Sequence, residues 1–270
     1  MLPVRKRCIS VAVLLPAFAL AGRAQSQEPK LPDKALKAIR QQIAFDDHLP
    51  GEKNPAGLHL EFSKIGENNV PQGHVVAYRV YAAGADEKKK YVKAIWRIGS
   101  QPQFLPDDVY VNARGLLMAN MPRPDQETKD SVDSDNEDDI AIQAALGEPI
   151  RFFLATPDGK LAIPGTVVPY PIESEDKGCH LEARLAMPQA AAVVLYVDGL
   201  QPNTDIPFQS VAEGESHSGN FHTNASGHGA AIILPGVIGK SSGMLKVTVT
   251  TKECIVSVEV PWGNGTNHPM

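Results

Sequence analysis

Cysteine is scarce in this chain, with three residues in 270. Cys8 stands near the start, and neither Cys179 nor Cys254 belongs to a Cys-x-x-Cys pair, which disfavours a metal site or a catalytic thiol. A phosphate-binding glycine loop is also missing. The sequence therefore carries no motif of a nucleotide-binding protein.

Long apolar runs are missing too, apart from one at the N-terminus. Three basic residues, Arg5 to Arg7, precede the uncharged run Ile9–Ala21, and small residues follow up to Ala24. This order is typical of a secretory signal peptide, and cleavage after Ala24 or after Ala21 fits it, with Ala24 preferred. The run is short of the roughly 20 residues that a membrane-spanning helix needs. We therefore expect residues 1–24 to be a signal peptide and the protein to be exported, to the periplasm or outside the cell.

Positive charge is under-represented once the signal peptide is removed. The remaining 246 residues, enough for one large or two ordinary domains, hold 22 basic and 31 acidic side chains, a net charge of −9. An acidic balance disfavours nucleic acids and anionic membrane surfaces as partners. We expect a protein or glycan partner instead, and neither a cofactor nor a membrane span in the mature chain.

The two cysteines of the mature chain are expected to pair, because two cysteines in an exported protein most often form a disulfide. A Cys179–Cys254 bridge closes a loop of about 76 residues, for which the chain-entropy model gives roughly 4–5 kcal/mol of stabilisation.

A flexible lead with a short helix is predicted for residues 25–49. Asp33 can cap the helix, and Leu36, Ile39 and Ile43 recur at helical spacing up to Phe45. The polar side of this helix carries three basic residues, Lys34, Lys37 and Arg40. A helix that covers a sheet edge or leads into the first domain is favoured over one that binds a membrane.

From Gly57 onward the apolar period changes to two, which predicts antiparallel strands at short spacing. The expected strands lie at 58–62, 75–81, 91–98, 109–112 and 116–118, followed by a hairpin of 150–155 and 160–168 around Thr156-Pro157-Asp158-Gly159. Pro164 disfavours a central position for the last of these strands. We assign residues 50–173 to an N-terminal β domain.

An acidic stretch, residues 122–139, interrupts this pattern. Asp133 and Asp135 alternate as in a calcium loop, but the glycine and glutamate that such a loop requires are replaced by Asp138 and Ala144. A short helix, opened by a Ser134/Glu137 capping box and ended by Gly147, explains the residues better. Asp133 and Asp135 remain weak candidates for calcium binding.

Residues 174–263 read as a second β domain of seven strands, followed by a tail at 264–270. The strands are expected at 180–187, 191–197, 206–211, 219–223, 230–234, 244–250 and 254–260. A hairpin turn is expected at 224–227, and the last two strands are expected to form a hairpin. Seven short strands in about 85 residues match an immunoglobulin-like (Ig-like) β-sandwich. The fold class is thus mainly β, with two tandem Ig-like sandwiches and one or two short helices. The first and last strands of the second sandwich should lie side by side and parallel, which brings Cys179 and Cys254 together.

Several motifs resemble those of uncharacterised exported bacterial proteins with Ig-like β-sandwich domains. They are Gly147-Glu148-Pro149 before Phe152-Phe153, Val168-Pro169-Tyr170-Pro171-Ile172-Glu173, Gly178-Cys179, Leu234-Pro235 and Pro261-Trp262-Gly263. The resemblance implies export and a β-sandwich, and it implies no activity and no catalytic residues.

Histidines form one group, His217, His222 and His228, whose spacings match no standard zinc pattern. If residues 219–234 form a hairpin, His222 and His228 face each other and could bind copper or zinc weakly. No nucleophile, base and oxyanion site can be assembled from the motifs present. We therefore expect a non-enzymatic binding, scaffold or cell-envelope interaction protein, with the acidic loop 125–139 and the hairpin around Asn224 as candidate surfaces. The alternatives are a periplasmic metal-handling protein and a secreted hydrolase with a site between the domains.

Overall fold

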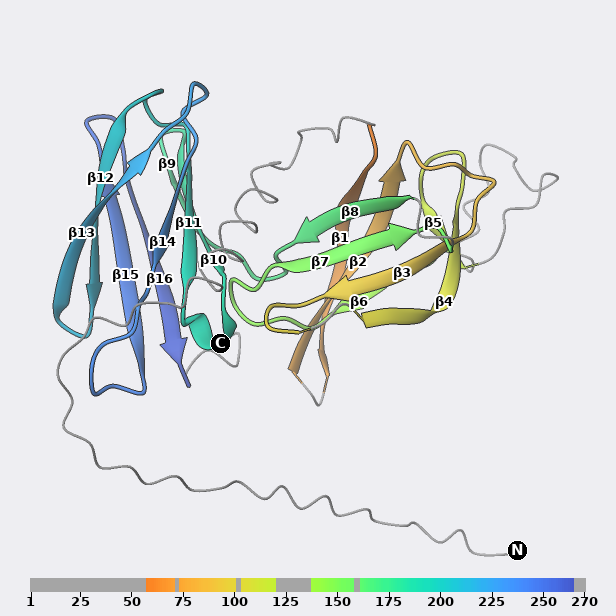
Figure 1. Ribbon diagram of the computed structural model, residues 1–270, viewed down its shortest axis with the longest axis horizontal. Coiled ribbons are helices and arrows are strands. Elements are labelled where there is room, and N and C mark those ends of the chain that lie inside the picture. The colour runs from red at the N-terminus through yellow and green to blue at the C-terminus, as the bar shows by residue number, and fades with distance from the viewer. Residues whose placement is uncertain (1–56, 71–72, 101–102, 120–136, 158–160, 265–270) are drawn as a thin grey trace, which may run out of the picture.

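A computed structural model describes residues 57–70, 73–100, 103–119, 137–157 and 161–264 (Figure 1). These residues form a mainly β protein of antiparallel sheets, with a single 3-10 turn at Pro188–Ala190 among them. No helix in these ranges is long and apolar enough to cross a membrane. The signal peptide and the helix expected at 33–45 lie outside the described residues.

The N-terminal part, β1 to β8, consists of two sheets. A three-stranded sheet has the order β1-β2-β6, and a five-stranded sheet has the order β5-β4-β3-β7-β8. The strands are β1 His59–Val70, β2 Gly73–Ala83, β3 Tyr91–Trp96, β4 Gln103–Val111, β5 Leu117–Met118, β6 Ile140–Ile142, β7 Ile150–Ala155 and β8 Ala162–Val167. Their inward side chains form one apolar core that includes Tyr91, Phe152 and Leu154, all 0% exposed.

The predicted hairpin of 150–155 and 160–168 is confirmed by the pairing of β7 with β8, from Ile150 opposite Val167 to Ala155 opposite Ala162. The second strand, β8, lies at the edge of its sheet. An edge position suits Pro164, because proline has no N–H to donate to a second neighbour.

The helix predicted to end at Gly147 is wrong over its described residues, where the chain forms strand β6 instead. Ile140 and Ile142 pair with Tyr78 and Val76 of β2. Burial alternates along the segment, since Ile140 and Ile142 are buried while Ala141 is exposed. In a strand, residues two apart lie on the same face, so both isoleucines can be buried together. In a helix they would point to different sides. Pairing with β2 therefore overrides the local capping signal.

Two cations of the N-terminal part hold the end of the acidic stretch against β2 and β3. Arg79 forms ion pairs with Glu137 and with Asp139, the latter at 3.2 Å from Nε to Oδ1. Lys93 is a buried residue, 5% exposed, and its ammonium donates a hydrogen bond to Asp138 Oδ2 at 2.7 Å. Residues 137–139 are therefore structural counter-ions, which leaves them little freedom to bind a cation.

Tyr78 gives the N-terminal core a titration that can be observed. Burial, and to a lesser degree the nearby Tyr170 and Glu67, raises its pKa to about 12. Tyrosine ionisation can be followed by ultraviolet absorbance, and the difference between the titration curves of the wild type and of Tyr78→Phe isolates Tyr78. We expect the midpoint of this difference curve about two pH units above the pKa of an ordinary tyrosine. Because the folded state holds this proton more tightly, its contribution to stability is complete below pH 10 and is lost as the pH rises towards 12. A midpoint near 10 would contradict the burial of this phenol.

The C-terminal part, β9 to β16, is built of two four-stranded sheets that pack face to face (Figure 1). Their orders are β14-β11-β10-β9 and β13-β12-β15-β16. The strands are β9 Ile172–Asp176, β10 Cys179–Leu185, β11 Val193–Asp198, β12 Asp205–Ala212, β13 Glu215–His222, β14 Gly229–Ile233, β15 Ser242–Thr250 and β16 Ile255–Gly263. The core between the sheets includes Leu181, Leu195, Phe221 and Val247, all 0% exposed.

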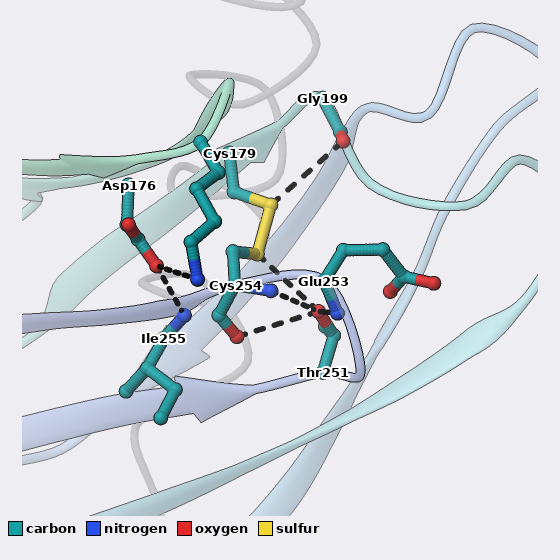
Figure 2. A network of polar contacts seen from close by, with 8 residues as sticks. Asp176, Cys179, Gly199, Thr251, Glu253, Cys254 and Ile255 are labelled. Carbon is teal, nitrogen blue, oxygen red and sulfur yellow. Dashed lines mark hydrogen bonds and ion pairs between the residues drawn. A yellow bond between two sulfur atoms is a disulfide. The ribbon is translucent and has the colours of Figure 1, made fainter.

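The predicted disulfide is confirmed: Cys179, the first residue of β10, is bonded to Cys254, directly before β16 (Figure 2). The expectation that these two strands lie side by side is wrong, because β10 and β16 belong to the two opposite sheets. The bridge therefore ties one sheet to the other across the core. At the same end Asp176 of β9 accepts a hydrogen bond from the backbone N of Ile255, at 2.9 Å.

Two further predictions for the C-terminal part need correction. Strand β9 is not among the expected strands, and the expected domain boundary after residue 173 lies inside it. Residues 219–234 do not form a hairpin, because β13 pairs with β12 while β14 pairs with β11 of the other sheet. The turn at 224–227 does exist, with Asn224 N donating to His228 O at 2.8 Å, but it carries the chain from one sheet to the other.

The two parts meet at the connection around Gly147. Its amide donates to Tyr170 O at 2.7 Å, and its carbonyl accepts from Leu185 N at 2.8 Å, which links it to β10. Gly147 has φ +70, and an added Cβ would lie 2.8 Å from the Ile172 side chain, so no larger residue fits there without a shift. Next to it, Glu148 forms two hydrogen bonds to the Arg97 guanidinium, at 2.6 and 3.0 Å.

Candidate functional site

The candidate site is a shallow groove of about 410 Å³ on the solvent face of the β13-β12-β15-β16 sheet. It is lined by residues of β12, β13 and β15: Pro207, Phe208, Gln209, Ser218, Gly219, Asn220, Thr248 and Thr250. Its size lies within the range of small-molecule sites in proteins, roughly 300–1,000 Å³. We call it the β12 groove.

Strand register places the polar lining in two rows across the sheet. Gln209 stands between Ser218 of β13 and Thr248 of β15, its partners in the antiparallel ladders. One step along β12, Pro207 is opposite Asn220. Alternation turns these side chains to solvent, while Ile206 and Ser210 of the same strand are buried.

A glycine and an aromatic ring shape the strand beneath the groove. Phe208 stands opposite Gly219 and packs against Phe221, with ring centroids 4.8 Å apart and ring planes inclined by 49°. A Cβ at position 219 would lie 2.4 Å from the Phe208 ring, so glycine is required for the ring to take this place. The Phe208 ring therefore lies directly against the β13 backbone at Gly219, and both residues line the groove.

The lining of the groove is neutral, and charges begin only beyond it. At one end His222 Nδ1 is 2.8 Å from Asp205 Oδ1, and at the other Lys246 Nζ is 3.3 Å from Glu259 Oε1. These charged groups already have partners. Amide and hydroxyl groups without net charge hydrogen-bond to hydroxyl-rich neutral ligands, and an ionic ligand would find no unpaired counter-charge here.

The three histidines expected to form a metal group are not brought together. His222 pairs with Asp205 on β12, and His228 pairs with Asp198 at the end of β11. His217 lies on β13, 3.9 Å from Glu215. No group of three or more metal-ligating side chains is gathered within the described ranges. Asp133 and Asp135, the calcium candidates, lie outside those ranges.

The His228 pair extends into a short polar chain on the other sheet. Asp198 also lies 3.8 Å from His180 Nδ1, and His180 Nε2 lies 3.2 Å from Glu173. A histidine beside a carboxylate can act as a base, yet hydrolysis also needs a nucleophile within hydrogen-bond reach. The His180, His222 and His228 rings each contact a carboxylate, that of Glu173, Asp205 and Asp198 respectively.

The β12 groove was not predicted, because none of its lining residues is a histidine or an acid, the residue types on which the candidate sites were based. Each strand does contain part of the signal: exposed uncharged residues alternate with less exposed ones at Pro207 and Gln209, at Ser218 and Asn220, and at Thr248 and Thr250. The charged residues of the same face, such as Asp205 and Lys246, stand at the ends of these stretches. That the three stretches are neighbours depends on pairing between segments distant in sequence.

Comparison with known proteins gives no family: no protein-family model matches the chain, and no curated protein matches it.

Proposed function

We propose that the protein is an exported, non-enzymatic binding module that acts in the periplasm or outside the cell. In this proposal residues 1–24 direct export, and residues 50–173 and 174–263 form two tandem Ig-like β-sandwiches. The face-to-face sheets of the C-terminal part and the inter-sheet disulfide support it, because disulfides persist in oxidising compartments.

The β12 groove is the proposed ligand site, and a neutral glycan is the proposed ligand class. The single observation that carries this proposal is the pair of neutral rows centred on Gln209 and Pro207, flanked by charged groups that are paired with each other. Hydroxyl and amide groups on three adjacent strands offer donors and acceptors at strand spacing, roughly 4.7–4.9 Å, which is suited to the repeated hydroxyls of a sugar chain.

The test is calorimetric titration of the mature chain with cellohexaose, maltohexaose and the hexamer of N-acetylglucosamine. We expect one of these neutral oligosaccharides to bind, and Gln209→Ala with Asn220→Ala to weaken binding at least about tenfold, which corresponds to 1.4 kcal/mol. The matched control is Asn68→Ala with Gln201→Ala, exposed residues of the same two types outside the groove, which should bind as the wild type does.

Failure of all three oligosaccharides to bind, or equal binding by Gln209→Ala with Asn220→Ala, would refute the groove as a glycan site. Appearance of new reducing ends during the titration would show hydrolysis and contradict the non-enzymatic part of the proposal.

A further inference from the structure

The β14-β11-β10-β9 sheet buries both of its faces, although only one faces the core of the C-terminal part. On the other face, here called the outer face, Val194 is 1% exposed and Tyr196 is 5% exposed. Around them are Ala192, which is 0% exposed, and the partly buried Ala230 and Ile232. The face of an antiparallel sheet that points away from the core is normally solvated, so an apolar, water-excluded surface here requires a cover.

No described apolar residue from outside this sheet and its β10–β11 connection supplies that cover. Every described apolar residue in this cluster comes from β11, β14 or the connection between β10 and β11. The Arg184 guanidinium lies 4.8 Å from the centre of the Tyr196 ring, and Glu182 accepts from Arg184 at 2.7 Å. One arginine–glutamate pair of the same sheet shields part of a tyrosine, but it does not exclude water from side chains on two neighbouring strands.

We propose that residues 33–45 of the same chain dock on this outer face. The apolar residues Leu36, Ile39 and Ile43 recur at helical spacing, which produces one apolar stripe of the kind that packs on a sheet. Lys34, Lys37 and Arg40 lie on the polar side of the expected helix, and Arg40 is the nearest of them to the apolar stripe.

Charge and chain length both suit this occupant. By register, the outer face carries four carboxylates, Glu182, Asp198 and, on β9, Glu173 and Glu175. The arginine on the same side of these strands, Arg184, is paired with Glu182, and His180 contacts Glu173, so the face is acidic. A segment with three basic residues and one acidic residue complements these carboxylates. Eleven residues, 46–56, connect it to the first described residue, Gly57, and such a connector reaches up to about 36–40 Å.

Docking would give the segment a mechanical role. It precedes β1 of the N-terminal part and covers a sheet of the C-terminal part, so it straps the two parts together beside the junction at Gly147. The β12 groove lies on the solvent face of the opposite sheet, and the strap leaves it open. The inference therefore stands or fails independently of the proposed ligand.

Hydroxyl-radical footprinting of Tyr196 and Met187 tests the proposal, because it reports side-chain exposure directly. We compare the mature chain 25–270 with a chain that begins at residue 50 and with full-length Leu36→Asp/Ile39→Asp. We expect labelling of Tyr196 to rise several-fold in both, and addition of a peptide of residues 31–47 to the shortened chain to restore protection.

The matched control is Ala38→Asp/Gln41→Asp, which adds the same two charges on the opposite side of the expected helix and should leave Tyr196 protected. If the shortened chain fails to fold, as judged by far-ultraviolet circular dichroism, the two full-length double variants decide the matter. Tyr196 protected equally in Leu36→Asp/Ile39→Asp and in the wild type would overturn the proposal and assign the cover to another part of the chain. Equal exposure in the two double variants would also overturn it, because the apolar stripe would then have no special role.

Discussion

Replacement of both bridged cysteines, Cys179→Ala with Cys254→Ala, is expected to lower the free energy of unfolding of the C-terminal part by about 4–5 kcal/mol. The bridge spans 75 positions of sequence and joins opposite sheets, so its loss releases a long loop in the unfolded chain. A typical domain is stable by only about 5–15 kcal/mol, which makes this a large fraction of the total. Chemical denaturation of the oxidised wild type and of the double variant measures the difference.

The folded structure around the bridge should survive the replacement. Thr251 Oγ accepts from the backbone N of Cys254 at 3.0 Å and of Glu253 at 3.1 Å, and Asp176 accepts from Ile255 N (Figure 2). These bonds hold the turn before β16 without the disulfide. The effect should therefore lie in the unfolded state, where a more expanded chain exposes more surface and raises the denaturant m value.

Reduction provides the control for this prediction. Dithiothreitol should shift the wild-type denaturation midpoint to that of the double variant and leave the variant itself unchanged. A loss of less than about 1 kcal/mol, or an unchanged m value, would show that the bridge does not restrain the unfolded chain as the entropy model requires.

Local signals predicted the hairpins of this fold, and non-local pairing accounts for the errors. The β7–β8 and β15–β16 pairs follow from alternation on either side of a short connection, and both were predicted correctly. The turn at Asn224 has the same local signature, yet its flanking strands join different sheets. A turn determines where the chain reverses, but the partner of each strand is decided by burial across the whole core.

Polar edge strands and competing caps explain the remaining errors. Strand β9 has the sequence Ile172-Glu-Ser-Glu-Asp, with one apolar residue, because it is an edge strand that buries only Ile172. Strand β6 has three residues, too few for alternation to outweigh the capping pattern that precedes it. The β12 groove was not predicted, since its rows arise only after β12 is placed between β13 and β15.

Truncation of the largest fully buried side chain of the C-terminal core, Phe221→Ala, is expected to cost about 3–5 kcal/mol. Phe221 is 0% exposed and packs against Phe208, so its removal leaves a cavity that the rigid β12 and β13 ladders cannot close. The measurement is calorimetry of the variant beside Phe152→Ala, the equivalent truncation in the N-terminal core, where Phe152 is also 0% exposed.

Comparison of the thermal transitions of Phe221→Ala and Phe152→Ala tests whether the two parts unfold separately. The two cores share no buried residue, and the parts are linked by a few backbone bonds, such as Leu185 N to Gly147 O, and by Ile98, Ala145 and Leu146, which pack against the C-terminal core. Each variant should therefore lower one of two thermal transitions by at least about 12 °C, on the scale of 4–8 °C per kcal/mol for domains of this size, and leave the other nearly unchanged. A single transition lowered equally by both variants would show that the junction couples the parts into one cooperative unit. The strap proposed for residues 33–45 would be one source of such coupling, and Leu36→Asp/Ile39→Asp should then separate the transitions.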